Sequence, residues 1–158
     1  MNKITQKEIK ELVELLGKLS NPEKGLPGEV FNALTRIVPF SACELVVVNT
    51  KKEILLTYRE DRWWKGWHIP GGLLRMNEDF KTRLGKVAKN ELGAKLKSFK
   101  FLFPINYKKT PRGHDVSLVF LCILTGKLQH GTFFKNLPKN TIKEHNILYK
   151  KLRELKLV

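Results

Sequence analysis

Residues 71–94 constrain the fold more than any other part of the chain. A glycine pair, Gly71-Gly72, precedes a stretch with helical spacing over residues 79–92, and Gly93 is placed to end that helix. Apolar runs typical of strands lie on both sides, ACELVVV and EILLTYR before it and KSFKFLFPINY and DVSLVFLCILTG after it. This order predicts an α/β domain of the α+β sandwich kind, with a mixed β-sheet flanked by helices.

Further helices are expected at both ends of the chain. Residues 5–19 form an amphipathic helix with an apolar stripe that consists of Ile9, Leu12, Val13, Leu16 and Leu19. We expect the stripe to pack on the main domain or on a partner subunit, as in a homodimer. A short helix over about residues 28–37 and a tail helix over 143–157 complete the set. We therefore expect the chain to consist of an N-terminal helical extension, residues 1–28, and one domain, residues 29–158.

The strands before the glycine pair have their own turn signal. Asn49-Thr50-Lys51-Lys52 separates the first two apolar runs, which predicts a β-hairpin between them. A loop rich in Trp and Arg, EDRWWKG, leads to a short strand, WHIP. The glycine pair that follows predicts a tight turn that exposes backbone carbonyls.

Composition narrows the class of protein. A chain of 158 residues, 42% hydrophobic, supports one core. No run approaches the roughly 18 apolar residues of a spanning helix, and the first residues lack a signal-peptide pattern, so we expect a cytoplasmic location and no membrane. Cys43 and Cys122 lie in separate apolar runs, which favours buried thiols over ligands or a disulfide.

Net charge points to anionic partners. The formal charge of +15 attracts phosphates, nucleotides, RNA or acidic lipid headgroups, although lysine-rich surfaces also arise from genome bias or growth at high temperature. The basic residues are spread along the chain and do not form one block. We therefore expect a general attraction for phosphate, with nucleic acid as the second choice.

One motif carries the chemistry. The residues Gly72, Glu78, Lys86, Val87, Ala88, Asn90, Glu91, Gly93 and Ala94 match the spacing of the Nudix box without a gap. The chain therefore resembles Nudix hydrolases, and the resemblance implies the Nudix fold and a loop-helix-loop that holds a divalent metal against a diphosphate. Glu78 has two interpretations, a direct role or a cap of the box helix.

The box is poor in carboxylates. Val87, Asn90 and Glu91 share one helix face by spacing, and only Glu91 is acidic. Mg²⁺ needs only one or two protein carboxylates besides substrate phosphates and water. We expect one Mg²⁺, with Mn²⁺ as the alternative, held by Glu91 and a carbonyl of Gly71.

The chain is also similar to GDP-mannose mannosyl hydrolases over roughly residues 31–126, including Trp67-x-x-Pro70-Gly71-Gly72. That resemblance implies cleavage of the sugar C–O bond of a nucleoside diphosphate sugar. It assigns stabilisation of the leaving diphosphate to Arg59 and Lys86, and sugar or base orientation to Glu44. In the tail it makes Glu144 a metal ligand and His145 the general base.

Other residues are candidates for substrate contact. Trp64 or Trp67 presents a face for a nucleobase, Arg62 reaches phosphate or faces water, and His114 is the reserve base. His68, within the short strand, is interpreted as packed or surface-exposed. Two alternatives to glycosyl cleavage stay open: a pyrophosphohydrolase, and a catalytically degenerate module that binds nucleotide or RNA.

Overall fold

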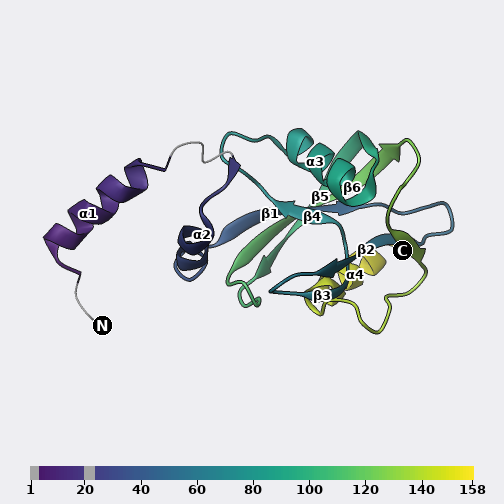
Figure 1. Cartoon of the computed structure of the whole chain (residues 1–158). Helices are drawn as coiled ribbons and strands as arrows, with labels where there is room; N and C mark the ends of the chain where they lie inside the picture. Colours follow the sequence, from purple (N-terminus) through teal and green to yellow (C-terminus); the bar gives the residue numbers. More distant parts are fainter. Residues whose placement is uncertain (1–3, 20–23) are drawn as a thin grey trace.

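The computed structural model describes residues 4–19 and 24–158. Two helices precede the strands of two β-sheets, and the long helix α3 is inserted in the chain order between β4 and β5, two strands of the same sheet (Figure 1). The elements are α1 (Gln6–Gly17), α2 (Gly28–Leu34), β1 (Phe40–Val46), β2 (Ile54–Glu60), β3 (Lys65–His68), β4 (Gly71–Leu73), α3 (Phe80–Leu92), β5 (Lys95–Tyr107), β6 (Asp115–Thr125), β7 (Thr132–Phe134) and α4 (Glu144–Glu154).

The strands divide over two sheets, where the sequence predicted one. One sheet has the order β4-β1-β6-β5 and mixes parallel and antiparallel pairs, and the other has the order β3-β2-β7. The predicted hairpin between β1 and β2 is wrong beyond its tip. Asn49 and Glu53 close the turn, and Val48 forms a bridge with Ile54, but β1 and β2 then enter different sheets. The short strand β7 had no signal in the sequence.

Two apolar clusters form the core, one on each face of β1. Cys43 and Leu45 face α3, whereas Val46 packs with Ile54 and with Leu148 of α4. Alternation along a strand sends neighbouring side chains to opposite faces, so Glu44 points to the α4 side. Cys43 and Cys122 are free and buried, as predicted.

Local signals set the bounds of α3. Asp79 caps its N-terminus by accepting a hydrogen bond from the Thr82 N–H at 2.6 Å, and Gly93 ends it with a left-handed φ of 65°. Gly71 and Gly72, in contrast, do not form the predicted tight turn. Both lie in β4, paired with β1.

Helix α1 has a complete capping box between Thr5 and Glu8, and none of its residues is buried. It lies apart from the two sheets (Figure 1). The packing of its apolar stripe therefore stays a prediction, as does the extension over residues 1–28, part of which lies outside the described residues. No described helix is long and apolar enough to cross a bilayer.

Candidate functional site

Two adjoining cavities open where the two sheets meet the end of α3 and the start of α4. The first has a volume of about 680 Å³ and is lined by β2, β3, the loop before β7 and the last turn of α3. The second, of about 280 Å³, is lined by β1, β4, β6 and the first residues of α4. Both cavities share Arg59, His68 and Gly71.

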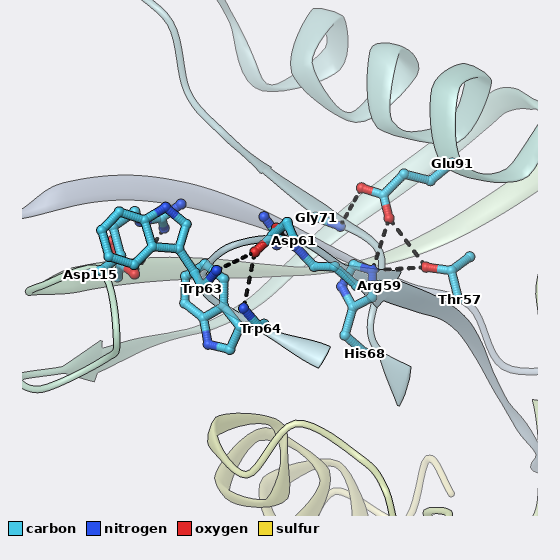
Figure 2. A network of polar contacts seen from close by, with 10 residues as sticks. Thr57, Arg59, Asp61, Trp63, Trp64, His68, Gly71, Glu91 and Asp115 are labelled. Carbon is cyan, nitrogen blue, oxygen red and sulfur yellow. Dashed lines mark hydrogen bonds and ion pairs between the residues drawn. The ribbon is translucent and has the colours of Figure 1, made fainter. Parts of the chain in front are cut away.

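Glu91 is the centre of a polar network in the first cavity (Figure 2). Its Oε1 accepts a hydrogen bond from the Gly71 N–H at 3.2 Å. Its Oε2 accepts one from the Thr57 hydroxyl at 3.2 Å and lies 3.3 Å from His68 Nε2. Thr57 Oγ1 also lies 3.0 Å from the same ring nitrogen. The carboxylate is thus held in one orientation by groups from β2, β3 and β4.

Gly71 faces Glu91 because of its register. The Leu45 N–H donates to the Pro70 carbonyl at 2.8 Å, so the neighbouring pair Glu44–Gly71 is the non-hydrogen-bonded kind, and the peptide groups of Gly71 point away from β1. The carbonyl of Gly71 therefore lies on the same side as its N–H, toward Glu91. A Cβ at this position would collide with the Glu44 carboxylate. Close packing, and not a turn, is the reason for glycine.

The donor set fits one divalent ion and no larger centre. Glu91 and the Gly71 carbonyl supply two hard oxygen ligands, and each carboxylate oxygen retains lone-pair capacity beside its present bonds. Val87 is only 4% exposed and belongs to the core, and Asn90 is exposed. Within residues 4–19 and 24–158 no group of three or more His, Cys, Asp or Glu side chains is placed to hold a metal.

Glu44 occupies the floor of the second cavity. Its carboxylate accepts a hydrogen bond from Ser117 Oγ at 2.8 Å and is 9% exposed. Burial raises the pKa of Glu44 to about 7, against the opposing effects of the Ser117 hydroxyl and His68. A carboxyl group with this pKa exchanges protons near neutral pH.

Glu144 and His145 enter the same cavity from the first turn of α4. Residues 140–142 hold them there, since the Trp67 N–H donates to the Asn140 carbonyl at 3.0 Å and the Ile142 N–H donates to the Trp67 carbonyl at 2.9 Å. Glu144 Oε1 and His145 Nδ1 are both shielded from solvent and have no hydrogen-bond partner in the described chain. Both residues line the cavity, and each thus brings a polar atom without a protein partner to it.

The pKa of His145 differs from the ordinary histidine pKa of about 6.5. Desolvation, with help from His68 and Arg59, lowers the pKa of His145 to about 3. Its ring lies 5.8 Å from that of His68. The imidazole is therefore neutral at pH 7, with a free acceptor nitrogen.

Arg59 lies between the two cavities. Its Nε donates to Asp61 Oδ2 at 2.5 Å, and its guanidinium lies 4.8 Å from the centre of a Trp64 ring, while Arg112 lies 5.1 Å from the same indole. Two cations on one indole leave Trp64 less free to stack a base than the sequence indicated. Asp61 also accepts hydrogen bonds from the backbone N–H groups of Trp63 and Trp64, at 2.7 and 3.0 Å (Figure 2).

Lys86 lines neither cavity, so the structure does not bring it together with Arg59, and its predicted role at the leaving diphosphate stays a prediction. Its Nζ binds Glu78 Oε1 at 2.8 Å. Arg83 and the Arg75 N–H bind the other oxygen, at 2.5 and 3.1 Å. Burial alone would raise the pKa of Glu78, but the bonds from Lys86, Arg75 and Arg83 outweigh it and lower that pKa. Glu78 and Lys86 therefore fix the loop before α3, and the cap is Asp79.

Two predicted substrate contacts also lie elsewhere. Arg62 and His114 line a separate cavity near α2, where Arg62 bonds to Asn32 and stacks on Trp63 at 4.4 Å. Trp67 lines the first cavity and packs edge-on against Phe134 at 4.8 Å.

Sequence reasoning missed four residues that organise the site, Thr57, Asp61, His68 and Arg112. His68 was interpreted as packed or surface-exposed, yet its ring is 5% exposed and contacts Glu91. Its alternation with Trp67 in β3 carried a signal, because the residue next to a partly exposed one faces the opposite side. Thr57 and Arg112 had no such signal, since the residues that tie them to the site, Glu91 for Thr57 and Trp64 for Arg112, lie far away in the sequence.

Known proteins share this architecture. The NUDIX domain family model matches residues 39–147. A MutT NUDIX hydrolase from Burkholderia pseudomallei superposes with a TM-score of 0.64 at 20% identity, covering 73% of this chain and 98% of that one. A bifunctional NMN adenylyltransferase/ADP ribose pyrophosphatase from Francisella tularensis, complexed with AMP and a manganese ion, gives 0.56 at 16% identity, covering 94% of this chain and 46% of that one. The chain therefore belongs to the NUDIX domain family of hydrolases.

Proposed function

We propose that the chain hydrolyses a nucleoside diphosphate sugar in the presence of Mg²⁺, and that it cleaves the glycosidic C–O bond. The observation that carries this proposal is the entry of Glu144 and His145 into the cavity that also contains Arg59 and Gly71. This is the second cavity, and the first cavity, which contains Glu91, adjoins it. Attack on phosphorus with several metals needs more carboxylates than α3 supplies, whereas attack on carbon requires a metal only to stabilise the departing diphosphate.

One Mg²⁺, or Mn²⁺ in its place, would be held by Glu91 and the Gly71 carbonyl, with Glu144 as a further oxygen ligand. When bound, the ion supplies positive charge that stabilises the diphosphate as it departs. Arg59 adds a second positive charge at the same group, and Asp61 fixes its direction. This step does not require Lys86.

Water is the nucleophile in this mechanism. Its oxygen forms a bond to the anomeric carbon while the bond from that carbon to the diphosphate oxygen breaks, and the bonding electrons leave with the diphosphate. His145 accepts the water proton, and it is fully in the basic form at pH 7 because its pKa is about 3. A diphosphate next to Arg59 brings negative charge to the imidazole and raises this pKa toward the range in which a general base is effective.

The remaining polar groups suit recognition of the sugar. Glu44, at the floor of the second cavity, exposes a carboxyl edge to hydroxyl groups while Ser117 holds its other oxygen. Trp67, in the first cavity, offers the less encumbered indole face for a base. Nucleobase and sugar identity follow from a substrate panel and not from these contacts.

Hydrolysis in H₂¹⁸O separates the chemistries directly. Incubation of a panel of nucleotide sugars with and without Mg²⁺, followed by mass spectrometry, is expected to place the label in the free sugar. Label in a phosphate would instead mean attack on phosphorus and would refute glycosyl cleavage. Glu91→Gln is expected to abolish the Mg²⁺-dependent turnover, while Glu154→Gln, which removes an exposed carboxylate of α4, retains it.

A degenerate binding module is the second candidate, favoured by the burial of Val87 in the core. It predicts no labelled product from any nucleotide sugar. Calorimetry would then show nucleotide binding that is equal in wild type and Glu91→Gln.

A further inference from the structure

A third cavity, of about 840 Å³, lies between α2, the loop after β2 and the turn that joins β5 to β6. We call it the basic groove. Its principal side chains are Arg36, Arg62, Trp63, Lys108, Lys109 and His114. It takes no part in the hydrolysis proposed above.

The groove concentrates positive charge. Arg112 also lines it, and none of the described lining residues is Asp or Glu. Arg112 is neutralised by Asp115 at 2.8 Å. Across the described residues, Arg36, Lys108 and Lys109 form no salt bridge, and all three are exposed. Three cations without acidic partners around one hollow favour a ligand with several negative charges.

The groove also contains an ordered aromatic group. The Arg62 guanidinium lies 4.4 Å from the centre of a Trp63 ring and is fixed by a bond to the Asn32 side chain. The backbone N–H of Trp63 donates to Asp61 Oδ1 at 2.7 Å, which fixes the main chain that carries the indole (Figure 2). A flat guanidinium on an indole is a platform on which a nucleobase stacks, and the bond to Asn32 orients the guanidinium before any ligand arrives.

We propose that the basic groove binds a single-stranded nucleic acid without sequence preference. Its phosphates contact Arg36, Lys108 and Lys109, and one unpaired base stacks on the Arg62–Trp63 platform. A duplex does not meet this requirement, because its bases are already stacked on each other.

This surface corrects one expectation from the sequence. Because the basic residues are spread along the chain, the sequence predicted only a general attraction for phosphate. Residues 36, 62 and 108–109 are far apart in sequence, yet the fold gathers them around one cavity. The groove also shares Thr110 and Arg112 with the second cavity, so a bound strand lies next to the candidate active site.

Fluorescence anisotropy with the full chain and a labelled oligouridylate of about ten nucleotides tests the proposal. Without Mg²⁺, the wild type binds, and the logarithm of affinity falls linearly with the logarithm of salt concentration. Lys108→Ala with Lys109→Ala reduces the magnitude of this slope by about 1.4, at about 0.7 for each phosphate that a lysine no longer neutralises. The matched control, Lys97→Ala with Lys100→Ala, removes the same charge from exposed positions on β5 and leaves the slope close to that of wild type.

Trp63→Leu separates base stacking from plain charge. It is expected to weaken oligouridylate binding at least about fivefold and to leave binding of inorganic polyphosphate unchanged. Arg62→Lys, at an exposed position, keeps the charge but removes the flat guanidinium, and it repeats the test should the tryptophan variant fail to fold. No binding by wild type, equal effects of the two lysine pairs, or equal losses for both ligands would each overturn the proposal. Glu91→Gln should bind the oligonucleotide like wild type whether or not it hydrolyses nucleotide sugars.

Discussion

Glu44→Gln is expected to stabilise the fold at alkaline pH and to do so much less at acidic pH. Glu44 is a buried acid whose pKa is raised from 4.5 to about 7. The folded state therefore retains a proton that the unfolded state has lost between these two values. The contribution of Glu44 to stability must therefore fall as pH rises from about 4.5 to about 7 and then stay level, because at this residue the folded state binds more protons in that window.

The size of the effect follows from the two pKa values. Each pKa unit corresponds to about 1.4 kcal/mol. The change from 4.5 to about 7 thus makes ionisation of Glu44 cost about 3 kcal/mol of unfolding free energy above pH 7. Glutamine is neutral at every pH and still accepts the hydrogen bond of Ser117. Any cost of fitting its amide group is the same at every pH, so only the pH-dependent part tests the reasoning.

Urea unfolding of wild type and Glu44→Gln at a series of pH values from about 4.5 to 8 measures the pH-dependent part of their stability difference. The stability difference should grow by about 3 kcal/mol in favour of the variant across this range. Glu154→Gln, at an exposed position of α4, controls for loss of one surface carboxylate. A difference between wild type and Glu44→Gln that is constant with pH would refute the assignment of a raised pKa to Glu44.

Three further perturbations test the loop before α3, the glycine pair and the general base. Glu78→Gln is expected to cost about 3 kcal/mol in urea unfolding because it breaks a buried ion pair. Lys86→Ala removes a side chain that is 54% exposed, so it is expected to cost less than about 1 kcal/mol and to keep turnover. Loss of turnover without loss of stability in Lys86→Ala would restore the catalytic role of Lys86. Gly71→Ala is expected to cost about 1–3 kcal/mol by thermal unfolding through its collision with Glu44, and Gly85→Ala, which meets nothing within 4 Å, is the control that should not destabilise. His145→Gln should lower kcat by about 100-fold or more and leave nucleotide affinity by calorimetry unchanged; an unaltered kcat removes His145 from the mechanism.

The sequence predicted elements whose signals are local. The box helix was predicted over residues 79–92 and observed over Phe80–Leu92, because its cap Asp79 and its terminating Gly93 both lie within one turn of the ends. The hairpin between β1 and β2 was predicted from an equally local turn. It failed because β1 is buried over five consecutive residues and needs a neighbour on each edge, which β4 and β6 provide.

Prediction of the site residues also succeeded where the signal is local and failed where it is not. Glu91 came from the spacing of the box and Gly71 from the family resemblance, and the structure places the Gly71 nitrogen 3.2 Å from Glu91 Oε1. Arg59 lies at the cavities whereas Arg62 lies in the basic groove, although they are only three positions apart in the sequence. The bend of the chain at Asp61, which binds the following N–H groups, turns the two arginines to different surfaces. The spacing of the two arginines in the sequence does not predict such a bend.

The loss of carboxylates from the box has a physical consequence for metal binding. Val87 packs with Leu84, Ala88 and Leu92 in the core, and a Cβ on Gly72 would lie 3.2 Å from its methyl group. A glutamate at position 87 would bury a charge there at a cost of several kcal/mol unless a cation compensated it. Valine removes that cost. It also leaves Glu91 as the one carboxylate of the box helix face, so in the proposed mechanism the ion would draw much of its affinity from the substrate diphosphate, which would couple metal binding to substrate binding.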